Sequence, residues 1–423
     1  MRSATTRVLA AATATALTFG FWAAASGTAH ARIDASDRAS ASRDAGIAHK
    51  ASGYGTKVRG GQVPVGSDTT AFMVIGCATR TGVEKGNHEA EAELPGAGTV
   101  SGVRTKLWTV RSGAAVHTYS RNTTANVVLA QSGLGTIEIT AIRSLSHAWH
   151  DAQGFHADTS VSVGNLLFTP PVGKPQELDL PTPGQPIEIP GLAKISVGAK
   201  KESASDQAGI AIADALRVHL IPTNTKLTVA HSNARVYGGV KHGTFRGSSA
   251  ATRVSAADDT ITSGRTPLSL MPCQGTDGEQ WTKQLAVLDA GGEIIVEGLR
   301  SSQRGKQFSD RSVAMERGSI ASLNFGDGAL VIDAVAAQAN VTRTAGGKVT
   351  SNTQGTTIGS ITADGEAQEF PDTGVIEIPG LAKIERKIVE RTRFGISVIA
   401  LRITLLDGTA AVIDLGVART SIR

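Results

Sequence analysis

Imidazole and carboxylate side chains gather between positions 147 and 158, and these groups suit zinc. They are His147, His150, Asp151, His156 and Asp158. Residues 150–154 (HDAQG) are typical of a hairpin turn, so we expect His147 and His156 to face each other across two strands. A metal-dependent hydrolase that uses His147, His150 and His156 is therefore one alternative function. The spacing fits no standard zinc signature, which favours a polar hairpin tip that faces solvent or a partner.

The stretch that corresponds to this cluster later in the chain, residues 336–348, contains no histidine. The difference suggests a surface that one part of the chain has and the other lacks. Trp149 lies within the cluster, and tryptophan often anchors protein interfaces. Trp149 is therefore a candidate partner-binding residue.

Signatures of common enzyme chemistries do not appear elsewhere in the sequence. Residues 88–93 (HEAEAE) lack the second histidine of a zinc-protease helix, and residues 96–98 (GAG) lack the third glycine of a dinucleotide loop. There is no G-x-S-x-G elbow and no phosphate-binding GxxxxGK[ST] loop. We therefore predict a protein that is not an enzyme and that needs no cofactor.

Residues 1–31 have the pattern of a secretory signal peptide. Arg2 and Arg7 precede an apolar run, and Ala29-His30-Ala31 fits a cleavage site. We expect the protein to be secreted into the extracellular medium without inserting into a membrane. Loss of the two arginines lowers the net charge from +5 to +3, which does not favour nucleic-acid binding.

Residues 32–53 are rich in Ala, Ser, Arg and Asp and are predicted to form a flexible arm. The arm is either a spacer or a segment that orders when it binds a partner. In the second case Ile33 and Ile47 would be its apolar anchors.

The strongest pattern in the sequence is an internal repeat. Residues 187–195 (IEIPGLAKI) recur without a change at 376–384. Residues 135–141 (GTIEITA) likewise resemble 328–334 (GALVIDA), and 215–220 (ALRVHL) resemble 400–405 (ALRITL). We predict two tandem domains, repeat 1 over 54–236 and repeat 2 over 237–423, with Tyr54 matched to Tyr237.

Apolar residues within both copies alternate with polar ones, as in a strand with one buried face. Leu216, Val218 and Leu220 show this period of two. The fold class is therefore all-β, with each copy a β-sandwich or barrel-like domain. Arg217 and Arg402 lie at matched positions and are expected to form cross-strand ion pairs. Residues 200–215 are the best candidate for a helix.

Cys77 and Cys273 occupy corresponding places in the two copies. Two cysteines in an exported chain are expected to pair, so we predict one disulfide between the domains. Two separate thiols are the alternative if the two places lie too far apart.

The repeated Ile-Pro-Gly-Leu motif, the strands that end at Ala141 and Ala334, and the Ala-Leu-Arg strands resemble the choice-of-anchor P proteins that filamentous actinobacteria export. The chain also resembles the adaptor subunit of secreted umbrella-type toxin particles. That resemblance implies an adaptor that bridges other secreted proteins, among them a lectin-like subunit and a toxin-bearing subunit. A cell-envelope or glycan-binding module is the other alternative, with Trp108, Trp149 and Trp281 available to contact sugars.

Overall fold

The computed structural model describes residues 46–60, 69–94, 96–131, 133–256, 261–289, 294–371, 374–406 and 411–423. Within these ranges every regular element is a β-strand, and the strands form four antiparallel sheets. The predicted all-β class is confirmed. The expected helix at 200–215 is wrong, because that segment is the hairpin of β11 (Ala193–Ser205) and β12 (Ala208–Leu220).

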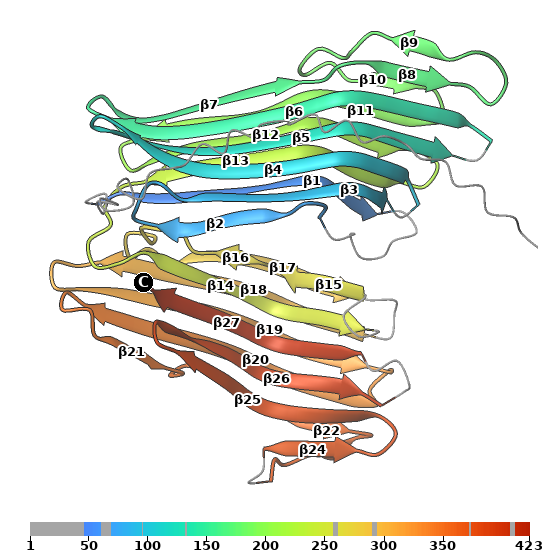
Figure 1. Ribbon diagram of the computed structural model, residues 1–423. Coiled ribbons are helices and arrows are strands. Elements are labelled where there is room, and N and C mark those ends of the chain that lie inside the picture. Colours follow the sequence, from blue (N-terminus) through green and yellow to red (C-terminus); the bar gives the residue numbers. More distant parts are fainter. Residues whose placement is uncertain are drawn as a thin grey trace, which may run out of the picture. The chain divides into compact units, whose positions relative to one another are not determined.

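The first two sheets contain strands β1 to β13 (Figure 1). Sheet I has the order β10-β11-β12-β13-β1-β2. Its other strands are β10 (Ile187–Ile189), β13 (Thr225–Tyr237), β1 (Ala48–Gly60) and β2 (Met73–Ala78). Sheet II has the order β3-β4-β5-β6-β8-β9, with β7 paired to β6. Its strands are β3 (Glu84–Leu94), β4 (Gly98–Ser112), β5 (Ala115–Gln131), β6 (Gly135–Asp151), β7 (Gly154–Ser162), β8 (Leu166–Thr169) and β9 (Gln176–Leu178).

The other two sheets contain strands β14 to β27. Sheet III has the order β15-β14-β27-β26-β25-β24, with β16 on β14. Its strands are β14 (Phe245–Ala256), β15 (Ile261–Thr266), β16 (Ser269–Leu270), β24 (Val375–Ile378), β25 (Ala382–Thr392), β26 (Gly395–Leu405) and β27 (Val412–Ile422). Sheet IV has the order β17-β18-β19-β20-β22-β23, with β21 on β20. Its strands are β17 (Trp281–Asp289), β18 (Ile294–Gln307), β19 (Arg311–Phe325), β20 (Leu330–Thr344), β21 (Val349–Asn352), β22 (Ile361–Ala363) and β23 (Glu366–Ala367).

The strand orders of sheets I and II recur in sheets III and IV. In sheet III, β24 to β27 follow the same order as β10 to β13, and β14 then takes the place of β1. In sheet IV, β17 to β20 take the places of β3 to β6. We call the strands of sheets I and II the first half and those of sheets III and IV the second half.

The boundaries between these halves differ from the predicted ones. β1 begins at Ala48, so the last six residues assigned to the arm belong to a strand. Tyr54 lies in the middle of β1 opposite His231, whereas Tyr237 ends β13 opposite Ala48. Tyr54 and Tyr237 therefore do not hold equivalent places, and the strands divide the chain at 48–237 and 245–422.

A row of small residues crosses sheets II and IV and interrupts their ladders. In sheet II the row includes Gly102 and Ala141, which have φ angles of 60° and 53°. In sheet IV the matching residues are Gly298 and Ala334, at 61° and 52°. A Cβ on Gly102 would lie 2.6 Å from the Cβ of Ala125, so only glycine fits there. The repeated Thr-Ala and Asp-Ala endings in the sequence mark these bulges.

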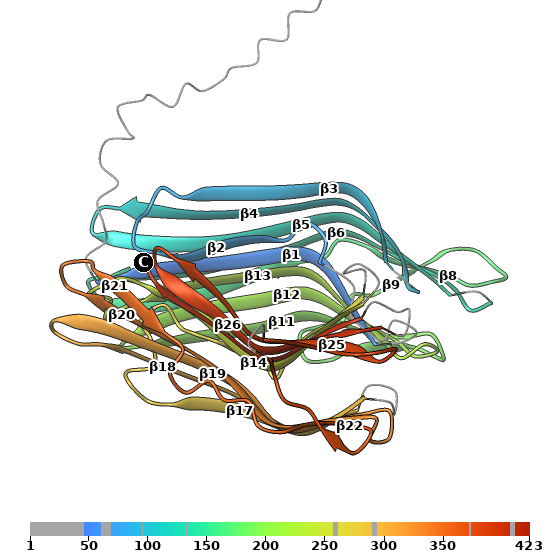
Figure 2. The same ribbon diagram turned by 90° about the horizontal axis from the view of Figure 1, so that it is seen from below.

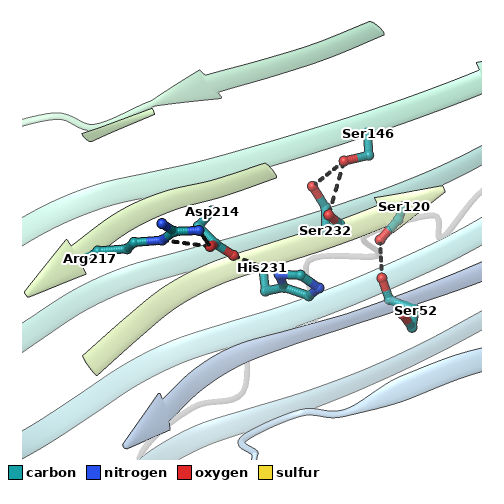
Figure 3. A network of polar contacts seen from close by, with 7 residues as sticks. All are labelled: Ser52, Ser120, Ser146, Asp214, Arg217, His231 and Ser232. Carbon is teal, nitrogen blue, oxygen red and sulfur yellow. Dashed lines mark hydrogen bonds and ion pairs between the residues drawn. The ribbon is translucent and has the colours of Figure 1, made fainter. Parts of the chain in front are cut away.

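The core of each half lies between its two sheets. In the first half, the apolar end of this core contains Ile137, Ile139, Ile195 and Leu216, all buried. The other end holds small and hydroxyl residues whose hydrogen bonds connect the sheets (Figure 3). Ser120 Oγ donates to Ser52 O at 2.9 Å, and the hydroxyls of Ser146 and Ser232 lie 2.8 Å apart. Short side chains here let the two sheets approach closely.

A disulfide joins the first half to the second. Cys77 of β2 is bonded to Cys273, 196 positions later, with Cα atoms 5.5 Å apart. The predicted pairing is confirmed, and it fits an oxidising compartment. Arg246 Nη2 donates to the carbonyl of Cys77 at 2.6 Å, which adds a second link.

The predicted signal peptide, most of the arm and Ile33 lie outside the described residues. Across the part of the chain that the structure describes, we find no helix with the length and hydrophobicity needed to cross a bilayer.

Candidate functional site

Six ring side chains lie on the outer face of sheet II, and we call them the ring ladder. They are Trp108, His117, Tyr119, His147, Trp149 and His156. Strand register sets their order, because Trp108 is opposite Tyr119, Tyr119 is opposite His147, and Trp149 is opposite His156. Each side chain is partly buried.

The rings of the ladder stack face to face. Tyr119 and His147 have centroids 4.1 Å apart with planes 9° from parallel, and Trp108 lies 4.7 Å from Tyr119. Trp149 is 4.4 Å from His147 and 4.8 Å from His156. Because neighbours cover most ring faces, the ladder presents mainly ring edges outward. Ring edges carry partial positive charge and attract oxygen-rich groups.

The histidines in the middle of the ladder favour the neutral form. His117 Nδ1 and His147 Nε2 form a hydrogen bond of 3.0 Å. Burial, and then the nearby His117, lowers the pKa of His147 to about 4. Burial also lowers the pKa of His117. At neutral pH these two imidazoles are therefore uncharged.

Asp151 holds the end of the ladder at the β6–β7 hairpin. Its carboxylate accepts hydrogen bonds from Trp149 Nε1 at 3.1 Å and from the backbone of Gln153 at 2.9 Å. His156 Nε2 lies 2.9 Å from Asp151 Oδ1. The predicted turn at 150–154 is confirmed, and Trp149 is fixed by a stack on each side.

The three predicted metal ligands do not converge. His156 is opposite Trp149, not His147, and His147 is opposite Asp158. His150 points to the other face of the sheet and contacts Phe155 at 4.5 Å. Among the residues that the structure describes there is no group of three potential metal ligands. The alternative of a histidine metal site, and of a hydrolase built on it, is therefore not supported by this arrangement.

The matching face of sheet IV carries a groove instead of a stack of rings. Arg304 lies six residues beyond its bulge glycine, as Trp108 does, and Asn340 lies six beyond its bulge alanine, as His147 does. Met315 is opposite both, in the place of Tyr119. The groove has a volume of about 440 Å³. Its walls combine cationic, apolar and amide side chains, which are Arg304, Lys306, Phe308, Arg311, Val313, Met315, Gln338 and Asn340.

The cations of this groove gather around one aromatic ring. Lys306 Nζ and Arg311 Cζ lie 5.3 and 4.8 Å from the centre of the Phe308 ring. Arg311 also pairs with Asp310 at 2.8 Å. The groove therefore offers an apolar floor with a basic rim, which suits an acidic segment that carries an apolar side chain.

A third polar cluster lies on the outer face of sheet I (Figure 3). Asp214 accepts two hydrogen bonds from Arg217, at 2.8 and 2.5 Å, and lies 2.6 Å from His231 Nδ1. Burial alone would raise the pKa of Asp214, but the contacts with His231 and Arg217 outweigh it and lower the pKa. Tyr54 stacks on His231 at 4.5 Å.

This cluster borders a depression of about 470 Å³ with Arg59, Lys194 and Lys226 on its walls. Burial, and then the charge of Asp214, raises the pKa of Tyr54 to about 12. Ser232 follows His231 in the chain but points to the inner face, where it bonds Ser146. His231 therefore cannot activate that hydroxyl, and the geometry favours binding over nucleophilic chemistry.

The matching arginine of sheet III forms its ion pair with a different strand arrangement. Arg402 pairs across the strands with Asp414 at 2.8 Å, as predicted. Arg217 instead pairs with Asp214 on its own strand. The hydrogen bonds that Arg402 donates to the Asp414 carboxylate raise the pKa of Arg402.

Ile47, the second predicted anchor of the arm, packs against the buried residues Ala148, Ala234 and Val236. Its side chain therefore packs against the first half itself. Sequence reasoning missed Trp108, His117 and Tyr119 as parts of one surface with His147. The alternation of ring residues at 117 and 119, and again at 147 and 149, was the available signal.

The sequence matches no protein-family model and no curated protein. Among solved structures, a weak likeness links it to a variant of the vaccine antigen transferrin binding protein B from Haemophilus parasuis. The two are 8% identical, and the alignment covers 89% of this chain and 75% of the other. Its TM-score of 0.12 is too low to relate the two folds.

Proposed function

We propose that the protein is a secreted, non-enzymatic adaptor that joins two different extracellular proteins, one on each half. The observation that supports this most is the contrast between the ring ladder and the groove. Both occupy the same place relative to the bulges and the strand register, yet their chemistry differs. A doubled framework with two unlike surfaces can hold two unlike partners at a fixed spacing.

The two surfaces favour different contacts. The ladder presents ring edges and, near Trp108, the cations Lys106 and Arg121 at 5.8 and 5.7 Å. Its stacked rings are already ordered, so binding would cost little side-chain entropy. The groove offers space for an inserted side chain and cations for an acidic neighbour. The resemblance to umbrella-particle adaptors makes a lectin-like subunit and a toxin-bearing subunit the first partners to test.

A glycan-binding module is the second candidate. Trp281 is 46% exposed and could stack on a sugar. Trp108 and Trp149 are less suitable, because neighbouring side chains cover their ring faces. Sugar recognition on the ladder would have to use ring edges, which is the weaker mode for a pyranose face. A glycan array probed with the full chain tests this candidate, and the lack of binding to any glycan would contradict it.

The adaptor proposal is tested by recovery of complexes from culture medium. The tagged full chain is expressed in the producing organism, purified under mild conditions and analysed by native mass spectrometry. We expect complexes in which two different proteins are present in stoichiometric amounts. A free monomer at every growth stage would contradict the proposal.

A further inference from the structure

The depression on the outer face of sheet I has more positive than negative charge on its walls. Its cations are Arg59, Lys194, Arg217 and Lys226. Among the described residues on these walls, Asp214 is the only carboxylate, and it is buried and already bonded to Arg217 and His231. Within the described part of the chain, Arg59, Lys194 and Lys226 take part in no ion pair. The depression therefore attracts anions.

Three of these cations form one row across the sheet. β11, β12, β13 and β1 lie side by side, and their register sets the row (Figure 2). Lys194 is opposite His219, which is opposite Lys226, and Lys226 is in turn opposite Arg59. Exposed Glu188 of β10 lies opposite Lys194 at the end of the row, so the row keeps an excess of positive charge. Since neighbouring strands are about 4.8 Å apart, the row suits a linear ligand with repeated negative charges.

The fourth cation, Arg217, is held in a fixed orientation beside this row. Its Nε and Nη2 donate to Asp214 Oδ2 at 2.8 and 2.5 Å, which leaves Nη1 to a ligand (Figure 3). The second oxygen of Asp214 lies 2.6 Å from His231, and Tyr54 stacks on that imidazole. The planar guanidinium matches carboxylate and phosphate groups, and its fixed orientation lowers the entropy cost of binding.

The surroundings of Arg217 are polar and lack an apolar anchor. Ser196 and Thr228 lie opposite Arg217 on the two neighbouring strands, and each adds a hydroxyl group. The apolar residues of the depression, Val218 and Leu227, are buried in the core. The centre of a protein interface is usually apolar or aromatic. Hydroxyl groups between cations instead match a ligand that carries both hydroxyls and negative charges, which is an acidic sugar chain.

The second half lacks this cluster. Arg402 matches Arg217, and register from these two arginines gives the equivalents in sheet III of Arg59, Lys226, Asp214 and His231. These equivalents are uncharged and are Ser255, Val412, Ile399 and Val417. The framework therefore does not require the cations or the pair of Asp214 and His231, and this favours a role in binding.

We propose that this depression binds an acidic polysaccharide, whose carboxylate or phosphate groups follow the row of cations. One anionic group accepts from Nη1 of Arg217, and sugar hydroxyls bond the hydroxyl groups beside it. The site lies on a different sheet from the ring ladder and the groove, and it needs no second protein. The inference therefore goes beyond the proposed adaptor function and does not depend on it.

Calorimetric titration of the purified full chain tests the proposal. The probes are polygalacturonate, which carries a carboxylate on each sugar, and a phosphomannan. We expect at least one to bind, with affinity falling about tenfold between low and high salt because the contacts are ionic. The tighter ligand identifies the anionic group. Neutral dextran should not bind, and polyglutamate should bind more weakly because it lacks sugar hydroxyls.

The variant Arg59→Ser/Lys226→Val gives the depression the residues of sheet III and should weaken binding about tenfold. Since both side chains are exposed, its thermal midpoint should stay close to that of the parent chain. Arg217→Lys keeps the charge but loses the planar guanidinium, so it should also weaken binding. The matched control, Lys348→Gln/Arg391→Gln, removes two exposed cations of the second half and should bind like the parent.

Unchanged binding by Arg59→Ser/Lys226→Val, an equal loss in the control, or no binding of either polymer would overturn the proposal. Binding of polyglutamate as tight as that of the polysaccharides would assign the depression to an acidic protein segment instead. Trp281→Ala should bind like the parent, and a loss there would place the sugar site at that tryptophan. These measurements need no partner protein. Their failure therefore leaves the adaptor proposal standing, whereas failure to recover complexes from medium leaves the polysaccharide result standing.

Discussion

The outer faces of sheets II and IV show how one framework supports two surfaces. Three places defined by the bulges and the register hold Trp108, Tyr119 and His147 in one sheet and Arg304, Met315 and Asn340 in the other. The bulge residues and the strand order are the same in both. The backbone therefore depends little on these side chains, and any difference in binding must come from them.

The interiors of the two halves differ at a matched place as well. Ser120 in β5 donates a hydrogen bond to the facing sheet at 2.9 Å. The equivalent residue in β19, Glu316, is fully buried, and neither carboxyl oxygen has a hydrogen-bond partner among the described residues. Burial raises the pKa of Glu316 well above its usual value. At this one place the first half thus has a hydrogen-bonded hydroxyl where the second has a carboxyl group without a partner among the described residues.

The disulfide is the strongest link between these halves, so its loss has the largest expected effect. Cys77→Ser/Cys273→Ser removes a cross-link over 196 positions and should cost about 5 kcal/mol in the free energy of unfolding. We expect calorimetry to show the halves melting further apart than in the parent chain. A variant that melts as the parent does would show that the bond adds nothing to stability.

The ladder should stabilise the first half more than the groove stabilises the second. Tyr119→Ala removes stacks with Trp108, His117 and His147 and should cost about 3 kcal/mol. Met315→Ala at the matched place should cost about 1 kcal/mol, since one wall of its surroundings is open. Urea unfolding measures both changes. Equal losses in the free energy of unfolding would contradict the expected difference between the ladder and the groove.

Replacement of the buried acid should stabilise the second half. Because the folded-state pKa of Glu316 is raised, the protein loses stability as pH increases above the unfolded value of 4.5. Glu316→Gln removes that loss and should add about 2 kcal/mol at pH 8 and little at pH 4.5. Ser120→Ala, the matched control, should destabilise at both pH values. A destabilised Glu316→Gln at pH 8 would contradict the account.

The smallest expected effect comes from the histidines of the ladder. The pKa of His147 is lowered from 6.5 to about 4, so the unfolded chain binds a proton that the folded chain does not. Stability should therefore fall as pH decreases from 6.5 towards 4. Solvent screening limits the loss to about 1 kcal/mol or less. His147→Gln should make the thermal midpoint depend less on pH across this window. An unchanged dependence on pH would exclude His147 as the cause.

Local patterns in the sequence predicted the strands, the hairpin at 150–154 and the disulfide. Alternation such as that of Leu216, Val218 and Leu220 reports which side chains share a face, whatever their tertiary neighbours. The helix expected at 200–215 was wrong, because its alanines lie in the hairpin of β11 and β12. Two of them, Ala211 and Ala213, are buried between closely spaced sheets, where large side chains would not fit.

The site could not be predicted in the same way, because it depends on register between distant segments. Trp108, Tyr119 and His147 meet only when three long strands pair in one alignment. A shift of one residue would send each ring to the opposite face. The bulges fix that alignment, and they are visible in the sequence only as small residues in repeated motifs.

Two single-surface variants test the central claim most directly. Tyr119→Ser alters the ladder, and Met315→Arg fills the groove with a larger, charged side chain. Both tagged chains are purified from culture medium with the parent, and co-purifying proteins are quantified by mass spectrometry. The account predicts that each variant loses a different protein and retains the other. Loss of the same protein by both, or of none by either, would contradict it.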